Sequence, residues 1–200
     1  MKTIIKYELV INEALRSALN YDTPDEQINE FIRFFGKHIG SDRIYIFEDC
    51  DEKHVTKNTY EWCADGIVPE IHELQNVDMD IIGWWYQTFD KDRNVIITDI
   101  EQIKDEHRES YNLLKAQNVK NLVVCPIHYK DEIKGFFGVD NPPESDTLGL
   151  TTFLDMIGTL LISLLKLRNS FTKSNKEAML SSYSSLCGFT PRKCTTSSKV

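Results

Sequence analysis

Cysteine and histidine are the side chains of this sequence best suited to nucleophilic or metal chemistry, and their spacing argues against both. Cys125 and His128 lie three residues apart in a predicted strand, where such side chains point to opposite faces and do not meet. The five histidines show no metal-ligand spacing, and none pairs with a cysteine as in zinc sites. We therefore expect a protein that is not an enzyme, with no catalytic residue and no metal site.

Aromatic residues are better candidates for binding a small molecule. Trp84, Trp85 and Tyr86 are consecutive in a predicted helix, so they cannot all face the core. Pocket lining and plain packing both remain open for them, as they do for Trp62 at a predicted strand end. Asp99 follows an apolar run, where it either accepts a hydrogen bond from a ligand or caps the next helix.

The composition is that of an ordinary globular protein. Of its 200 residues, 41% are hydrophobic and 27% are charged, which is enough for one domain with a sizeable core. The net charge of −8 argues against nucleic acid or an anionic membrane as a partner. Five cysteines, an odd number without a CxxC motif, favour a reducing compartment. No signal peptide or membrane span is predicted, so we expect a cytoplasmic protein.

Apolar periodicity and turn residues predict the order of the elements. The first helix runs from Ile4 to Ala18. Thr23 caps a second helix, with Pro24 at its first position and Glu26 completing the capping box, and this helix ends at Gly40. Beyond it we expect strands at 43–48, 55–63 and 95–98, and helices at 69–74, 81–89 and 101–117.

Residues 122–140 read as a β-hairpin in which alternate side chains share a face. Cys125 falls on the same face as Val123 in the first strand. In the second strand Phe137 and its alternate neighbours share one face, whereas Phe136 and Asp140 share the other.

A long helix begins near Asp146 or Thr147 and carries a heptad seam, which is typical of a helix that pairs with another. We expect a domain over residues 1–168, followed at 169–200 by a helix extension and a linker or disordered tail. The predicted dimer seam consists of Leu150, Phe153, Ile157, Leu160, Leu164 and Leu167.

Two sequence blocks together are fairly specific. They are Tyr-Glu-Trp-Cys at 60–63 and Gly-Phe-Phe-Gly-Val-Asp-Asn-Pro at 135–142, supported by segments 75–76, 95–99 and 122–127. Over roughly residues 5–168 the chain resembles a GAF sensor domain, of the type found before cyclic-di-GMP-synthesising (GGDEF) and related output domains of bacterial signalling proteins.

The resemblance implies an α+β fold with a five- to six-stranded antiparallel sheet, flanked by helices, whose N- and C-terminal helices pair. It further implies a homodimer whose last helix relays the state of a bound small molecule to an output domain. That output domain lies beyond the chain end or on another chain, because no GGDEF, EAL or kinase motif occurs here. Combined with strand-face geometry, the resemblance places the ligand-binding side chains at Trp62, Trp84, Trp85, Asp99, Cys125 and Phe137.

The ligand itself is unknown. The pattern Phe136-x-x-x-Asp140 is followed by Asn141 where cyclic-nucleotide binders have glutamate, and the Cys-His dipeptide of bilin binders is absent. One alternative is a module that dimerises without a ligand. Another is a methionine-sulfoxide reductase-like enzyme, which would require Cys63 and Cys125 to share a pocket.

Overall fold

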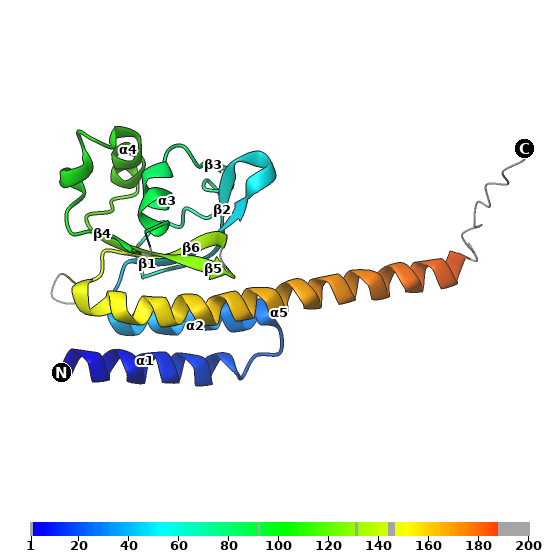
Figure 1. Cartoon of the computed structure of the whole chain (residues 1–200). Helices are drawn as coiled ribbons and strands as arrows, with labels where there is room; N and C mark the ends of the chain where they lie inside the picture. The colour runs from blue at the N-terminus through cyan, green and yellow to red at the C-terminus, as the bar shows by residue number, and fades with distance from the viewer. Residues whose placement is uncertain (1, 92, 131, 144–146, 188–200) are drawn as a thin grey trace, which may run out of the picture.

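A six-stranded antiparallel sheet separates two layers of helices (Figure 1). The computed structural model describes residues 2–91, 93–130, 132–143 and 147–187. The strand order across the sheet is β3-β2-β1-β6-β5-β4. The strands are β1 Arg43–Cys50, β2 Val55–Cys63, β3 Val77–Asp78, β4 Val95–Ile97, β5 Leu122–Tyr129 and β6 Glu132–Asp140. The predicted α+β architecture is thus confirmed.

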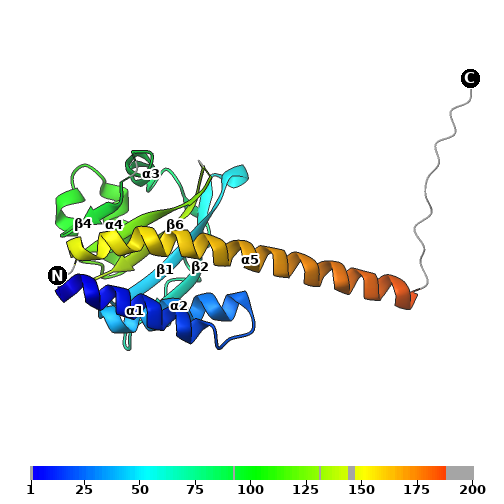
Figure 2. The same ribbon diagram turned by 60° about the horizontal axis from the view of Figure 1, so that its bottom comes forward.

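The helices divide unequally between the two faces. Two long helices, α2 (Pro24–Ile39) and α5 (Thr147–Cys187), lie on one face, and a third, α1 (Lys2–Ala18), packs against them on the side away from the sheet (Figures 1 and 2). The other face carries the short helices α3 (Gly83–Phe89) and α4 (Arg108–Ala116), with the single turn η2 (Ile100–Ile103). A further turn, η1 (Asp51–Lys53), joins β1 to β2.

Each central strand contributes to two cores. In β6, Phe137 and Val139 are buried against the long helices, whereas Phe136 faces the layer of short helices. In β1, Ile44 and Ile46 face the long helices, and Tyr45 and Phe47 face the other way. The predicted alternation is confirmed, and a sheet buried on both faces explains why β1 is apolar on both faces from Ile44 to Phe47.

Helix α2 begins and ends as predicted. The Thr23 hydroxyl accepts a hydrogen bond from the Glu26 amide at 3.3 Å, and the Glu26 carboxylate accepts one from the Thr23 amide at 3.1 Å. This capping box satisfies two of the amides that a helix start leaves unpaired. Gly40 ends the helix in the left-handed conformation, with φ of 76°.

The single helix predicted over 101–117 is instead broken into η2 and α4. The Ile100 amide donates to the Lys120 carbonyl at 2.8 Å, which ties this segment to the start of β5. The Tyr111 hydroxyl donates to the Glu101 carboxylate at 3.0 Å, although ten helical residues would separate them by about 15 Å. The chain therefore folds back on itself, and long-range contacts override the local helical pattern.

The short helix predicted at 69–74 is also absent, since the segment forms turns. The Glu61 carboxylate accepts hydrogen bonds from the amides of Glu70 and Ile71, at 2.9 and 3.1 Å. The start of this segment is thus held by a glutamate on β2 rather than by a helical turn of its own.

The predicted seam of α5 splits into two parts. Leu150, Phe153 and Ile157 are buried against the protein's own core, and Leu160 and Leu164 pack partly against it. Leu167 is 53% exposed. From residue 169 to 182 every side chain is exposed, and the helix crosses the expected boundary at 168 without interruption. Residues 188–200 of the expected tail lie outside the described residues.

Arg168 ties α5 to the domain near the point where the helix leaves it. Its guanidinium donates to both carboxylate oxygens of Glu48, at 2.7 Å each, and to the Tyr60 hydroxyl at 3.2 Å. Tyr60 in turn donates to Asp25 at the start of α2. These contacts join β1, β2 and α2 at the point where α5 leaves the domain. Within the described part of the chain, no helix has the length and apolarity that crossing a membrane requires.

Gly36 on α2 provides a test of the packing between α2 and the sheet. A Cβ atom at this position would lie 2.2 Å from the Trp62 ring and 2.9 Å from the Ile44 side chain. We expect Gly36→Ala to lower the free energy of unfolding by about 1–3 kcal/mol, because the overlap outweighs the better helix propensity of alanine. Urea denaturation measures the change. The control is Gly83→Ala, which meets no atom within 4 Å, and an equal effect of the two substitutions would contradict this packing.

Candidate functional site

A cavity of about 40 Å³ lies between the sheet and the chain that passes over it from Leu74 to Trp85. It is on the face opposite the three long helices, where α3 and α4 cover the sheet (Figure 1). Its walls are apolar and aromatic, with a small set of polar side chains at one end, a composition typical of ligand sites.

Four aromatic rings form the wall of the cavity. Tyr45 and Phe47 belong to β1, Phe136 belongs to β6, and Trp85 belongs to α3 on the other side of the cavity. Phe47 and Phe136 are stacked with ring centroids 4.7 Å apart, and Trp85 meets Phe136 edge-on at 5.5 Å. Tyr45 fits because its strand partner is Gly138, where a Cβ atom would lie 2.0 Å from the tyrosine ring.

Arg43 is the centre of the polar end. It is 3% exposed, and its Nη1 donates to Asp140 at 3.1 Å and to Gln117 at 3.3 Å. Its Nη2 donates to the Val68 carbonyl at 2.8 Å, and its Nε lies 3.4 Å from the Glu61 carboxylate. One buried guanidinium therefore connects β1, β2, β6, the loop after β2 and the end of α4.

The two carboxylates are compensated by different partners. Glu61 accepts hydrogen bonds from two backbone amides, described above, and from the Asn58 side-chain amide at 3.1 Å. Asp140 has Arg43 and the Tyr45 hydroxyl beside it. Burial raises the pKa of Asp140 to about 6, while Arg43 and Tyr45 act in the opposite direction. Burial also raises the pKa of Tyr45 well above its ordinary value.

Four buried polar atoms at the cavity are without hydrogen-bond partners in the described part of the chain. They are two donors, Nε of Arg43 and the indole Nε1 of Trp85, and two acceptors, the side-chain oxygen of Asn58 and Oδ1 of Asp140. Asn58 is 1% exposed and Trp85 is 4% exposed. Since buried polar groups are nearly always hydrogen-bonded, these atoms indicate missing partners in the cavity.

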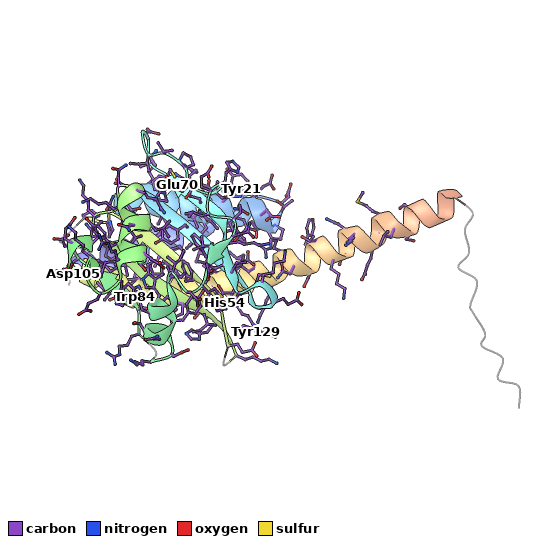
Figure 3. All side chains as sticks on the ribbon, turned by 90° about the horizontal axis from the view of Figure 1, so that it is seen from above. Tyr21, His54, Glu70, Trp84, Asp105 and Tyr129 are labelled. Atoms are coloured by element: carbon purple, nitrogen blue, oxygen red, sulfur yellow. The ribbon has the colours of Figure 1, made fainter. Side chains whose placement is uncertain are left out.

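Of the six predicted ligand-binding residues, only Trp85 lines this cavity. Trp84 lies beside it on α3 (Figure 3), where its indole donates to Ser110 at 3.0 Å and stacks on His107. Asp99 is exposed and caps η2 by accepting a hydrogen bond from the Glu101 amide. The structure therefore supports the capping interpretation of Asp99 in this state.

The other three predicted residues lie on the opposite side of the sheet. Cys125 and Phe137 are fully buried in the core beneath the long helices, and Trp62 packs against the same core. The strand-face alternation was right, but the prediction placed these residues on the wrong side of the sheet for this cavity. Periodicity groups side chains by face and does not say which face the long helices cover.

The polar residues of the cavity were not predicted as a group. Arg43 and Asp140 lie far in the sequence from each other and from Asn58 and Glu61, and no spacing pattern joins the three segments. One signal was present, because Asp140 shares a strand face with Phe136, which is expected to be buried. A charged residue on a face that is expected to be buried must have a partner, and that partner could have been sought.

The cysteine pair that a thiol-based reductase requires is not brought together. Cys63 is on β2 and Cys125 on β5, with β1 and β6 between them, a separation of about 14 Å at ordinary strand spacing. Burial, assisted by Glu61, raises the pKa of the Cys63 thiol to about 11. None of Cys50, Cys63 and Cys125 is part of a disulfide bond.

The spacing of residues in the sequence also did not predict one group of potential metal ligands. His54, Asp78 and Asp80 place their ligand atoms within 4.8 Å of one another at the exposed edge of β2 and β3. The His54 ring pairs with Asp80 at 2.9 Å, and this contact raises the pKa of His54. A surface ion pair accounts for this arrangement.

The buried carboxyl group of Asp140 should make stability depend on pH. Its pKa of about 6 exceeds the usual 3.8, so the folded state binds this proton more tightly than the unfolded state. Protonation of Asp140 therefore adds to the free energy of unfolding in full below the ordinary pKa, and this contribution is lost as pH rises through 6. Relative to Asp140→Asn, we expect the wild type to lose up to about 3 kcal/mol of unfolding free energy between pH 4 and pH 7. Denaturation of both proteins across this range measures it, and a difference that does not change with pH would contradict it.

Comparison with known proteins places this fold and cavity in context. The chain is 26% identical over 128 residues to the methanogenesis regulatory histidine kinase FilI of Methanothrix harundinacea (strain 6Ac). That match covers 62% of this chain and only 14% of the kinase.

Among solved structures, the fold resembles the biliverdin-bound, far-red absorbing dark state of JSC1_58120g3, with a TM-score of 0.65 and 12% identity over 80% of this chain and 99% of that one. It also resembles the GAF domain of an Acinetobacter phosphoenolpyruvate-protein phosphotransferase, with a TM-score of 0.62 and 10% identity over 84% and 97% of the two chains. The family model of the GAF domain matches residues 23–178. Because this match spans most of the chain and the fold agrees with it, the protein belongs to the GAF domain family.

Proposed function

We propose that this protein is the sensor part of a cytoplasmic signalling protein, and that α5 relays the state of the cavity to an output domain. The observation that carries the proposal is the course of α5. The helix packs on the face of the sheet opposite the cavity and then continues past Arg168 as an exposed helix (Figure 1). We place the functional end of the domain at Arg168, and the helix beyond it acts as the connection.

The central strands provide a physical route for the relay. Phe136 lines the cavity, and the next residue, Phe137, is buried under the long helices. Likewise Phe47 lines the cavity, and the next residue, Glu48, holds Arg168 of α5. A ligand that moves the aromatic wall would shift these strands and so change the position at which α5 leaves the domain, since packed interfaces switch between discrete arrangements.

Two kinds of output domain are compatible with this role of α5. A cyclic-di-GMP-synthesising domain fits the sequence resemblance, and a histidine kinase fits the relative FilI. Both outputs would have to follow α5 or belong to another chain.

The proposed active form is a homodimer in which α5 pairs with its copy. Leu167 and Phe171 are 53% and 41% exposed and continue the seam on which Leu160 and Leu164 are half-buried. Most helical stability in proteins comes from packing of an apolar face, so a partner helix would stabilise the exposed part of α5. A second candidate function, dimerisation without a ligand, is favoured by the small cavity, which four aromatic rings nearly fill.

Native mass spectrometry of the protein, purified gently from its own host, separates these functions. We expect a dimer with a reproducible extra mass that is lost on denaturation, because the cavity holds a small molecule. A dimer without added mass would favour the ligand-free module. A monomer would contradict relay through paired helices.

The dimer seam itself can be tested with one substitution. We expect Leu167→Glu to convert the dimer to a monomer, because like charges would face each other across the seam. Sedimentation velocity measures the result. Lys176→Glu, on the opposite face of the same helix, is the control and should leave the dimer intact. Equal behaviour of the two variants would show that this seam is not the interface.

A further inference from the structure

We propose that the cavity binds a small uncharged molecule, about the size of acetamide, that offers both a hydrogen-bond donor and an acceptor. This inference rests on the proposed sensor function, because it names the ligand class of the same cavity. Size, charge and hydrogen bonding each restrict that class.

The volume sets the size. A cavity of about 40 Å³ has room for about three water molecules, or for a compact molecule of a few non-hydrogen atoms. Leu113 and Gln117, which also line it, are only half-buried, so the cavity has an edge at the surface through which such a molecule can enter. A larger ligand would have to displace the stacked rings of Phe47 and Phe136.

The charged side chains are already compensated by one another. The Arg43 guanidinium is shared among Asp140, Gln117, Val68 and Glu61, so its charge already faces two carboxylates. Glu61 is held by backbone amides, Asn58 and Arg43. A charged ligand would lose its hydration and would meet a like charge in this network whichever sign it carried, which makes its burial unfavourable.

Among the described residues, the cavity leaves two donors and two acceptors to satisfy. Arg43 Nε and Trp85 Nε1 need acceptors, and the side-chain oxygens Asn58 Oδ1 and Asp140 Oδ1 need donors. A molecule that offers one donor and one acceptor, such as an amide, can satisfy one atom of each kind. The rings of Phe136 and Trp85, which meet edge-on, also offer aromatic surface to such a molecule.

The test uses three probes of the same shape and different charge: acetamide, acetate and acetamidinium. The protein has three tryptophans, and their indole N–H signals in a ¹H–¹⁵N spectrum report on three places. Trp85 lies at the cavity, Trp84 is bonded to Ser110, and Trp62 is beneath the long helices. Loss of one signal in Trp85→Phe identifies the Trp85 resonance.

We expect acetamide to shift the Trp85 signal saturably while the Trp62 signal stays in place. Acetate and acetamidinium should need at least tenfold higher concentrations for the same shift. Asn58→Leu should weaken the binding of acetamide by at least tenfold, because the ligand loses its acceptor. Asn121→Leu is the matched control, since Asn121 is also buried but lies outside the cavity, and it should leave the affinity unchanged.

Two results would overturn the inference. If acetate or acetamidinium shifts Trp85 as readily as acetamide does, the ligand class is wrong, although the cavity remains a binding site and the sensor function stands. If none of the three probes shifts Trp85 in the folded protein, the cavity does not accept such molecules. The sensor function fails by a different observation, namely a monomer or a dimer without added mass.

Discussion

The burial of Arg43 is the constraint on which much of this structure depends. A guanidinium that is 3% exposed requires partners on every side, and it finds them on β2, β6, the loop after β2 and the end of α4. Loss of Arg43 would leave Asp140 and Glu61 buried together without a cation, which is far more costly than loss of an exposed pair. The same network fixes the polar end of the cavity and holds the segment from Val68 to Leu74 over the sheet. Structural integrity and the candidate site therefore share one side chain.

The second organising feature is a sheet buried on both faces. Neighbouring residues of β1 and β6 belong to different cores. The cavity wall and the surface on which α5 packs are therefore built from the same strands. Close packing makes such strands poor at absorbing a local displacement, and a movement on one face tends to reach the other. The contact between Glu48 and Arg168 extends this connection to the point where α5 leaves the domain. Signalling through a terminal helix is a natural use of this architecture.

The cavity is small for a sensor, and its size has a physical origin. Tyr45, Phe47, Trp85 and Phe136 fill most of the space between the sheet and α3 with edge-on and stacked contacts. The cavity that remains is bordered by these rings and, at one end, by Arg43, Asn58, Glu61 and Asp140. The polar network thus determines which polar groups the cavity presents.

The sequence by itself determined the local features: the capped α2, the face alternation of the hairpin, the apolar middle of β1 and the apolar periodicity of α5. These depend on spacing and on neighbouring residues, and each acts over a few positions. The family could also be recognised from two short blocks. Only the tertiary structure decided which sheet face held the cavity, so Cys125, Phe137 and Trp62 were assigned to the wrong side of it. It also decided the fold-back of α4 onto Glu101 and the convergence of Arg43, Glu61 and Asp140, because these contacts join residues that no local pattern relates. Burial on both faces is the physical reason: it makes the two sides of each strand look alike in sequence and leaves long-range packing to distinguish them.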